Sequence, residues 1–213
     1  MRNLRSRIHL CRHGEVDSSW ATRIYGGKDV PLAPEGVERF RRLAKELRGR
    51  VFSLLVASDL QRARVGAELI GAELGMEPRL EPRLREIDRG RWAGMEREAL
   101  EPGAFEAYLA DPYGYRGHGG ESHADLEARI VPVLEELAEE FPGGEVFVVC
   151  HGQVQRVAAA WVLKLRNRDS MRFTHSHGGI TTLDRYADGH WQVQALNAPS
   201  LREGDWGGRV SKP

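Results

Sequence analysis

The sequence is poor in cysteine, has no excess of charge of either sign, and lacks a long apolar run. Only Cys11 and Cys150 occur in 213 residues, which excludes a disulfide framework and favours the reducing cytoplasm. We expect both to be small, buried packing residues. Lys and Arg total 31, as do Asp and Glu, so no overall charge draws the chain to nucleic acid or to an anionic membrane. The apolar run after Arg7 is too short for a signal peptide. We therefore expect a small-molecule partner, with neither nucleic acid nor membrane involved.

The chain does contain an ordinary share of core-forming residues, arranged as strands and helices in turn. Hydrophobic residues make up 41% and charged residues 29%, as in globular domains. Short apolar runs at 8–11, 54–57 and 146–150 are typical of buried parallel strands. Helical patterns follow from about 34, 59, 122 and 153. The alternation predicts an α/β fold, a three-layer α/β/α sandwich with a mostly parallel sheet.

The last third of the sequence predicts a hairpin and a tail. Residues 181–186 and 191–196 flank a turn at 187–190 and predict a hairpin at one edge of the sheet; pairing of such an edge with a second copy would give a homodimer. We expect one catalytic domain over 1–197, with a lid insertion at about 96–119 that contains a short helix at 104–110. Residues 198–213 are expected to form a polar C-terminal tail.

Polar residues follow two of the predicted strands directly. Arg12, His13 and Gly14 end the first run, and His151 ends the run at 146–150. In an open parallel sheet, ligands collect beyond the carboxyl ends of the strands. An arginine there offers donors that suit phosphate or carboxylate, and a glycine lets the backbone turn sharply. If the two strands are neighbours, the two imidazoles face one cavity.

Two later segments add charged residues to this edge. Arg62 opens the helix after the strand at 54–57, and Glu86 lies in a loop rich in Gly and Arg at 85–94. A histidine at a strand end is by itself more often a hydrogen-bonded structural residue. The combination of two histidines, two arginines and one glutamate instead predicts an anion-binding site with acid–base chemistry.

In their order along the chain, these motifs resemble the histidine phosphatase superfamily, which includes phosphoglycerate mutases, fructose-bisphosphatase domains and α-ribazole-phosphatase-like enzymes. The likeness runs from about 8 to 186. Residues 12–15 resemble the family signature that carries the nucleophilic histidine. Residues 111–112 and 120–122 are similar to the lid and helix start of the short phosphatase branch, the branch of the α-ribazole phosphatases.

The resemblance implies a catalytic role for each of the five residues. His13 becomes the nucleophile, Arg12 and Arg62 bind the phosphate, Glu86 donates a proton, and His151 is the second pocket histidine. The implied function is a phosphomonoesterase that hydrolyses a small phosphorylated metabolite through a phosphohistidine on His13, with no cofactor and no metal. Flanking guanidinium groups are expected to lower the pKa of the nucleophile and so to keep its lone pair free.

Four further residues are predicted to bind substrate: Gly14, Ser19, Arg23 and Gln153. Ser19 lies where many relatives place an asparagine a few residues after the signature, and Trp20 and Arg23 follow it. The amide of Gln153 either contacts substrate or caps the helix start, and a cap is favoured. For the His175/His177 pair, we expect a rim or loop role, because no third ligand lies near it in sequence to complete a metal site.

Two alternatives to hydrolysis stay open at this point. A mutase of the phosphoglycerate type needs a closed pocket and extra basic residues for a second acidic group. A non-catalytic protein that binds a phosphorylated ligand needs only the anion pocket. The presence of both His13 and Glu86 argues against the non-catalytic option, since binding alone needs no proton donor.

Overall fold

The computed structural model describes residues 3–201, so most of the predicted tail, residues 202–213, lies outside the described residues. Its strands are β1 (Leu4–Arg12), β2 (Leu54–Ala57), β3 (Arg79–Leu80), β4 (Glu145–Cys150), β5 (Ile180–Tyr186) and β6 (Trp191–Ala198). Its α-helices are α1 (Pro34–Glu46), α2 (Gln61–Leu74), α3 (Ala104–Ala110), α4 (His123–Glu140) and α5 (Gly152–Leu163).

The six strands form one sheet in the order β3-β2-β4-β1-β5-β6. The pairs among the first four strands are parallel, whereas β5 is antiparallel to both β1 and β6. This confirms the mostly parallel sheet and the hairpin at its edge. Strand β3 was not predicted, because its two residues are exposed and carry no apolar run.

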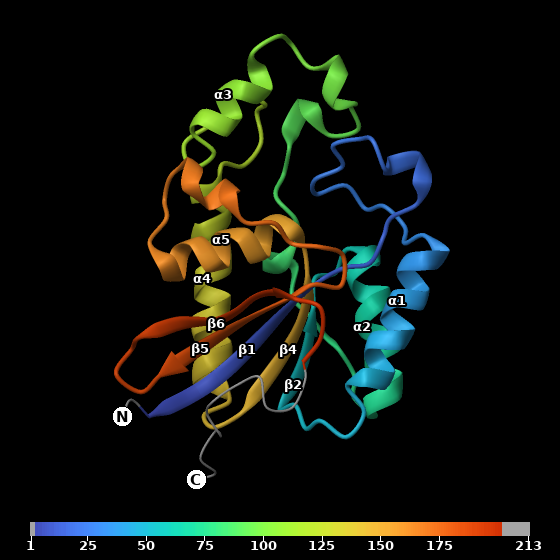
Figure 1. Cartoon of the computed structure of the whole chain (residues 1–213), viewed down its shortest axis with the longest axis vertical. Helices are drawn as coiled ribbons and strands as arrows, with labels where there is room; N and C mark the ends of the chain where they lie inside the picture. The colour runs from blue at the N-terminus through green and yellow to red at the C-terminus, as the bar shows by residue number, and fades with distance from the viewer. Residues whose placement is uncertain (1–2, 202–213) are drawn as a thin grey trace.

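Helices cover both faces of the sheet and confirm the three layers (Figure 1). Successive side chains of a strand point to opposite faces. Leu10 and Val148 pack with α4 and α5, while Cys11 and Val149, their neighbours in sequence, pack with the residues of α1 and α2. All four are fully buried. The continuous apolar runs at the strands therefore reflect burial on two sides.

Two helices begin directly after strands and carry predicted site residues into one region. Helix α2 begins at Gln61, so Arg62 lies in its first turn, and helix α5 begins at Gly152 with His151 as its N-cap. Since β2 and β4 are parallel neighbours, both helices start at the same edge of the sheet. The fold thus places the motifs on adjacent strand ends.

The segment predicted as a lid lies away from the sheet. Helix α3 spans the predicted residues 104–110 and lies beyond α5 at the far end of the molecule (Figure 1). Its Tyr108 is buried among aromatic rings, with Trp92 at 6.2 Å and Tyr115 at 6.0 Å between centroids. Aromatic packing of this kind anchors the segment. Within residues 3–201, no helix has the length and apolar character needed to cross a bilayer.

Candidate active site

His13 and His151 lie side by side at the carboxyl ends of neighbouring strands. Strands β1 and β4 pair in register, with Arg12 opposite Cys150, and the backbone N–H of His13 donates to the carbonyl of Cys150 at 2.9 Å. The two imidazole centroids are 5.3 Å apart, and both residues are fully buried. The predicted convergence of the imidazoles is present.

The hydrogen bonds of His13 fix which of its nitrogens carries the proton. Its Nδ1 lies 2.7 Å from the carbonyl oxygen of Gly14, and because a carbonyl only accepts, Nδ1 must donate. Its Nε2 is buried and has no hydrogen-bond partner among the described residues. Burial lowers the pKa of His13 well below its ordinary value, and the charges of Arg62 and Arg12 lower it further. His13 is therefore neutral at pH 7, with a free lone pair on Nε2.

Arg12 and Arg62 are held by carbonyl oxygens. Arg62 is fully buried, and its Nη1 and Nη2 donate to the carbonyls of Lys28 and Gly26 at 2.6 and 2.8 Å. Arg12 donates from Nη1 to the carbonyl of His175 at 2.6 Å. Both Nε atoms are buried without a partner, and neither arginine forms an ion pair in the part of the chain that the structure describes. Neither positive charge is therefore paired with a carboxylate at contact distance, although Glu86 acts on Arg62 at longer range.

His151 presents one nitrogen in the same unsatisfied state. Its Nε2 lies 2.9 Å from the hydroxyl oxygen of Ser58, at the end of β2, whereas its Nδ1 is buried and, within residues 3–201, unpartnered. Burial lowers the pKa of His151 well below its ordinary value, with Arg62 and His13 as further causes. When the Ser58 hydroxyl donates to Nε2, the neutral ring carries its proton on Nδ1 and can donate it to a ligand.

Glu86 joins the cluster through the first turn of α5. Its Oε2 accepts from the backbone N–H of Gln153 at 3.2 Å, and its Oε1 accepts from the N–H of Ile87 at 3.0 Å. The side chain is 9% exposed. Because His151 is the N-cap of the same helix, the carboxylate lies within one turn of the second pocket histidine. All five residues predicted to be catalytic are thus gathered at one edge of the sheet.

The structure corrects the prediction for Gln153 and gives Gly14 a packing role. The side-chain Oε1 of Gln153 accepts no hydrogen bond from the helix backbone, and the side chain lies beside His123 instead, so the favoured helix cap is wrong; the bond to Glu86 comes from the backbone. At Gly14, an added Cβ would lie 2.6 Å from the carbonyl oxygen of Gly36 in α1. Only glycine fits there. Substrate binding by these two residues stays a prediction.

Ser19 and Arg23, the other two residues assigned to substrate, lie on the surface. The backbone N–H of Ser19 donates to Asp17, as does its hydroxyl. Arg23 donates from Nη1 to the carbonyl of Gly94 at 3.1 Å. These contacts fasten their own loops and do not join the buried cluster, so their substrate roles also stay predictions.

His177 belongs to the cluster, although only a rim or loop role was expected for it. Its ring centroid lies 5.4 Å from that of His13, and its Nε2 is buried without a partner among the described residues. Burial and the charge of Arg12 lower its pKa to about 4. The loop before β5 reaches the end of β1 because these strands are antiparallel neighbours. No group of three or more His, Cys, Asp or Glu residues in 3–201 could hold a metal ion.

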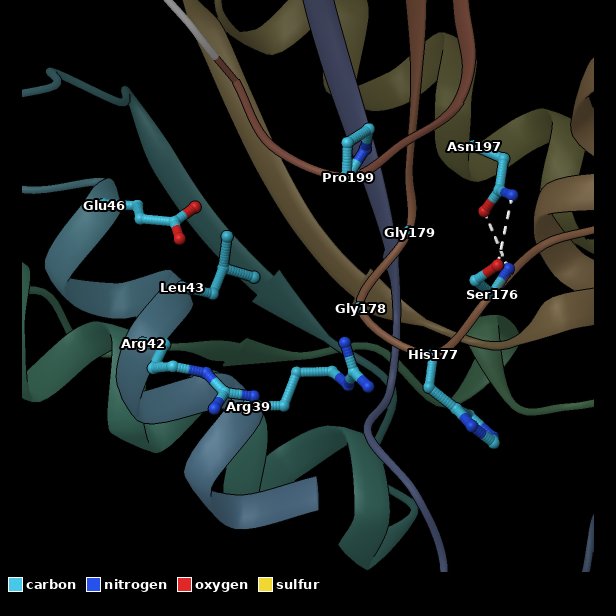
Figure 2. Close-up of a pocket in the computed structure, with 10 residues that line it drawn as sticks. All are labelled: Arg39, Arg42, Leu43, Glu46, Ser176, His177, Gly178, Gly179, Asn197 and Pro199. Atoms are coloured by element: carbon cyan, nitrogen blue, oxygen red, sulfur yellow. Dashed lines mark hydrogen bonds between the residues drawn. The ribbon is translucent and has the colours of Figure 1, made fainter. Parts of the chain in front are cut away.

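The backbone of His177 also borders a cavity of about 190 Å³ against α1. Figure 2 shows Arg39 and Arg42 reaching in from α1, while the ring of His177 points away from Arg42 on the other side of the β1 backbone. Arg39 is engaged by Glu15, which follows the signature histidine. His177 therefore both lines this cavity and contacts the ring of His13.

Comparisons with known proteins agree with this arrangement. Residues 8–199 match the histidine phosphatase superfamily (branch 1). The chain is 34% identical over 170 residues to the glucosyl-3-phosphoglycerate phosphatase of Mycobacterium tuberculosis, covering 75% of this chain and 76% of that one. It is 27% identical over 211 residues to the probable phosphoglycerate mutase GpmB of an Enterobacter species, covering 92% and 98%. The native structure of a mycobacterial glucosyl-3-phosphoglycerate phosphatase superposes with a TM-score of 0.84 at 29% identity, covering 92% and 100%.

Proposed function

This chain belongs to the histidine phosphatase superfamily, and we propose that it hydrolyses small phosphorylated metabolites through a phosphohistidine formed on His13. One observation carries the proposal: a neutral imidazole with a bare Nε2 is buried beside two arginines that have no carboxylate partner in the described chain. A phosphomonoester dianion supplies the missing negative charge and brings phosphorus to the lone pair. The metabolite phosphatases among the relatives support this substrate class.

Three unsatisfied donors suit the three peripheral oxygens of the phosphoryl group. They are the Nε–H groups of Arg12 and Arg62 and the Nδ1–H of His151. Charge-assisted hydrogen bonds from fixed arginines stabilise the charge that spreads over these oxygens during transfer. Because the carbonyls of residues 26, 28 and 175 already hold the guanidinium groups, little reorganisation is needed when substrate enters.

The reaction proceeds in two displacements. His13 Nε2 attacks phosphorus, the bond from phosphorus to the ester oxygen breaks, and the carboxyl group of Glu86 gives its proton to the leaving alcohol. Glu86, now a carboxylate, then takes a proton from water as the water oxygen attacks phosphorus. The P–N bond breaks, inorganic phosphate leaves, and neutral His13 is restored.

Hydrolysis of p-nitrophenyl phosphate by the full-length protein, with and without EDTA, tests this proposal. We expect turnover that survives the chelator, and a loss of about 10⁴-fold or more in kcat for His13→Ala, because removal of a nucleophile abolishes the covalent route. His9→Ala serves as the matched control and should keep the activity. His9 lies within β1, four residues before His13. A ³²P donor should label the wild type at an acid-labile site.

Two results would overturn the assignment: persistent labelling of His13→Ala, or activity abolished by EDTA. Conversion of 3-phosphoglycerate to 2-phosphoglycerate in the presence of a bisphosphate primer, without net release of phosphate, would identify a mutase instead. Tight binding of phosphate with no turnover of any ester would identify a binding protein.

We also propose a reducing compartment, the cytoplasm, because both cysteines are free and fully buried and burial raises the pKa of each thiol. They pack in the core on opposite faces of the sheet. A homodimer through the edge strand β6, and the absence of a nucleic-acid partner, stay predictions.

A further inference from the structure

Arg89 is a buried cation whose charge no carboxylate balances. It is 7% exposed, its Nη2 donates to the hydroxyl of Tyr108 at 3.0 Å, and its guanidinium carbon lies 4.6 Å from the centroid of that ring. Its Nη1 is buried without a partner, and no ion pair reaches it within residues 3–201. An unpaired buried charge costs several kcal/mol. A residue of this kind needs an explanation other than stability.

Arg89 adjoins the phosphate site through Gly26. A Cβ added to Gly26 would lie 2.7 Å from Cγ of Arg89, so the arginine stem packs directly on this glycine. The carbonyl of the same glycine accepts the hydrogen bond from Nη2 of Arg62. Arg89 also follows Glu86 by only three residues. A single residue, Gly26, thus lies between Arg89 and the phosphate-binding Arg62.

Arg156 brings a second cation without an ion pair to this place. It lies on α5, five residues after His151, and its Nε and Nη2 donate to the carbonyl of Phe173 at 3.3 and 3.0 Å. Burial lowers the pKa of Arg156; Tyr108 and Glu86 oppose this shift, whereas the charges of Arg89 and Arg12 add to it. It is therefore within electrostatic reach of the phosphate site and of Arg89. It has no ion pair in the described part of the chain.

The groups between these cations add hydrogen-bonding capacity but no negative charge. His123, 2% exposed, lies with its Nε2 at 3.1 Å from the Tyr108 hydroxyl. Burial, with Arg89 and Arg156 as further causes, lowers the pKa of His123 to about 3, so the ring is neutral at pH 7. Tyr108 belongs to α3, in the segment predicted as a lid. The cluster therefore joins that segment to the floor of the site.

We propose that Arg89 and Arg156, together with Tyr108 and His123, form a subsite for a second anionic group of the substrate. The inference rests on the proposed phosphatase function and narrows it to phosphomonoesters that also carry a carboxylate or a second phosphate. Planar guanidinium groups bind both anions with paired hydrogen bonds. The bound anion balances the charges that the protein leaves unpaired, and Tyr108 already holds the segment around α3 beside Arg89.

Matched substrates test the subsite. 3-Phosphoglycerate and glycerol 3-phosphate differ only in a carboxylate against a hydroxymethyl group, and fructose 1,6-bisphosphate and fructose 6-phosphate differ in a second phosphate. We expect the wild type to prefer the doubly acidic member of at least one pair by tenfold or more in kcat/KM. Arg89→Met should reduce that preference at least tenfold. A preference lost for the first pair identifies a carboxylate subsite, and a preference lost for the second pair identifies a phosphate subsite.

Arg97→Met is the matched control, because this exposed arginine stacks on Phe105, 4.4 Å from its centroid, in the same segment; it should leave the preference unchanged. Arg89→Met should also melt at or above the wild-type temperature, since it removes an unpaired buried charge. A lower Tm together with equal losses for both members of each pair would make Arg89 structural and overturn the inference.

Changes in Tm caused by the same compounds measure binding independently of turnover. The doubly acidic member should raise the Tm of the wild type more than its partner does, and Arg89→Met should abolish the difference. Equal shifts in the wild type would refute the subsite even if p-nitrophenyl phosphate is hydrolysed. A wild type that hydrolyses no ester but retains the unequal shifts would refute the phosphatase proposal and leave the second anion site supported.

Discussion

The two ends of strand β1 carry the same kinds of residue in opposite states. Before the carboxyl end, within the strand, Arg7 donates to both carboxylate oxygens of Asp184 at 2.7 and 2.8 Å, and His9 has both ring nitrogens engaged, by Thr182 at 2.9 Å and Glu145 at 3.0 Å. At its end, Arg12 and His13 each retain a buried nitrogen with no partner in the described chain. His9 and His13 are equally buried, so burial does not distinguish the two histidines.

The contrast shows which buried polar groups serve the fold and which serve a ligand. At the amino end, the protein supplies every counter-charge, as buried ions require. At the carboxyl end, Arg12, Arg62 and His151 are rigidly placed but incompletely satisfied. Their missing partner is an anion, which is what a phosphate ester provides. The unsatisfied groups are thus together complementary to a phosphoryl group.

The largest expected effect on stability lies at the amino end. Asp184→Asn keeps the shape of the pair but leaves Arg7 buried without a counter-charge, and should lower the free energy of unfolding by about 3–5 kcal/mol. Urea unfolding measures this loss. The kcat/KM for p-nitrophenyl phosphate, measured well below the Tm, should stay unchanged, because Arg7 precedes His13 by six residues along the extended chain.

The double variant Arg7→Met, Asp184→Leu controls for the charge. It removes both ions and should recover most of the lost stability. If Asp184→Asn instead reduced kcat/KM while the unfolding free energy stayed the same, the division of β1 into a structural end and a catalytic end would be wrong.

The same comparison shows which parts of the fold and of the site could be predicted from the sequence. The apolar runs that end in His13 and His151 predicted the parallel strands and their shared edge, because strand burial and strand ends are local features. His177 and Arg89 could not be assigned in the same way. His177 reaches the site only because β5 inserts beside β1 from a distant part of the chain, and the unpaired state of Arg89 depends on every side chain that surrounds it.

The next effect lies at the carboxyl end, at Arg62. Arg62→Met removes one of the two charges that face the phosphoryl group and should lower kcat/KM for p-nitrophenyl phosphate by about 10²–10³-fold. Its Tm also falls, since the carbonyls of Lys28 and Gly26 lose their donor. The discriminating measurement is the rise in Tm caused by inorganic phosphate.

At 100 times the Kd, phosphate stabilises the wild type by about 2.7 kcal/mol, a rise of roughly 5–10 °C. Arg62→Met should show little of this rise, whereas Asp184→Asn should show all of it despite its lower Tm. A full phosphate response in Arg62→Met would show that the buried guanidinium is only structural, and the contrast between the two ends would fail.

The smallest effect is on the pH dependence of stability, where His9 and His13 can be compared directly. Burial lowers the folded-state pKa of both, but Glu145 opposes this at His9, whereas Arg62 and Arg12 add to it at His13. Above the unfolded-state pKa of about 6.5, both states are neutral and neither histidine contributes to the slope. Below it, the unfolded chain binds a proton that the folded chain refuses, so stability falls as pH falls.

Each such proton contributes up to about 1.4 kcal/mol per pH unit to the slope. His13→Gln should therefore flatten the fall in unfolding free energy over a window that begins near pH 6.5 and extends far below it. His9→Gln should flatten it over a narrower window, because the carboxylate beside His9 keeps its folded-state pKa closer to the ordinary value. Urea titrations between pH 7 and pH 4 measure both slopes. Equal windows for the two variants would mean that the arginines around His13 do not hold its imidazole neutral, and the bare Nε2 would lose its physical basis.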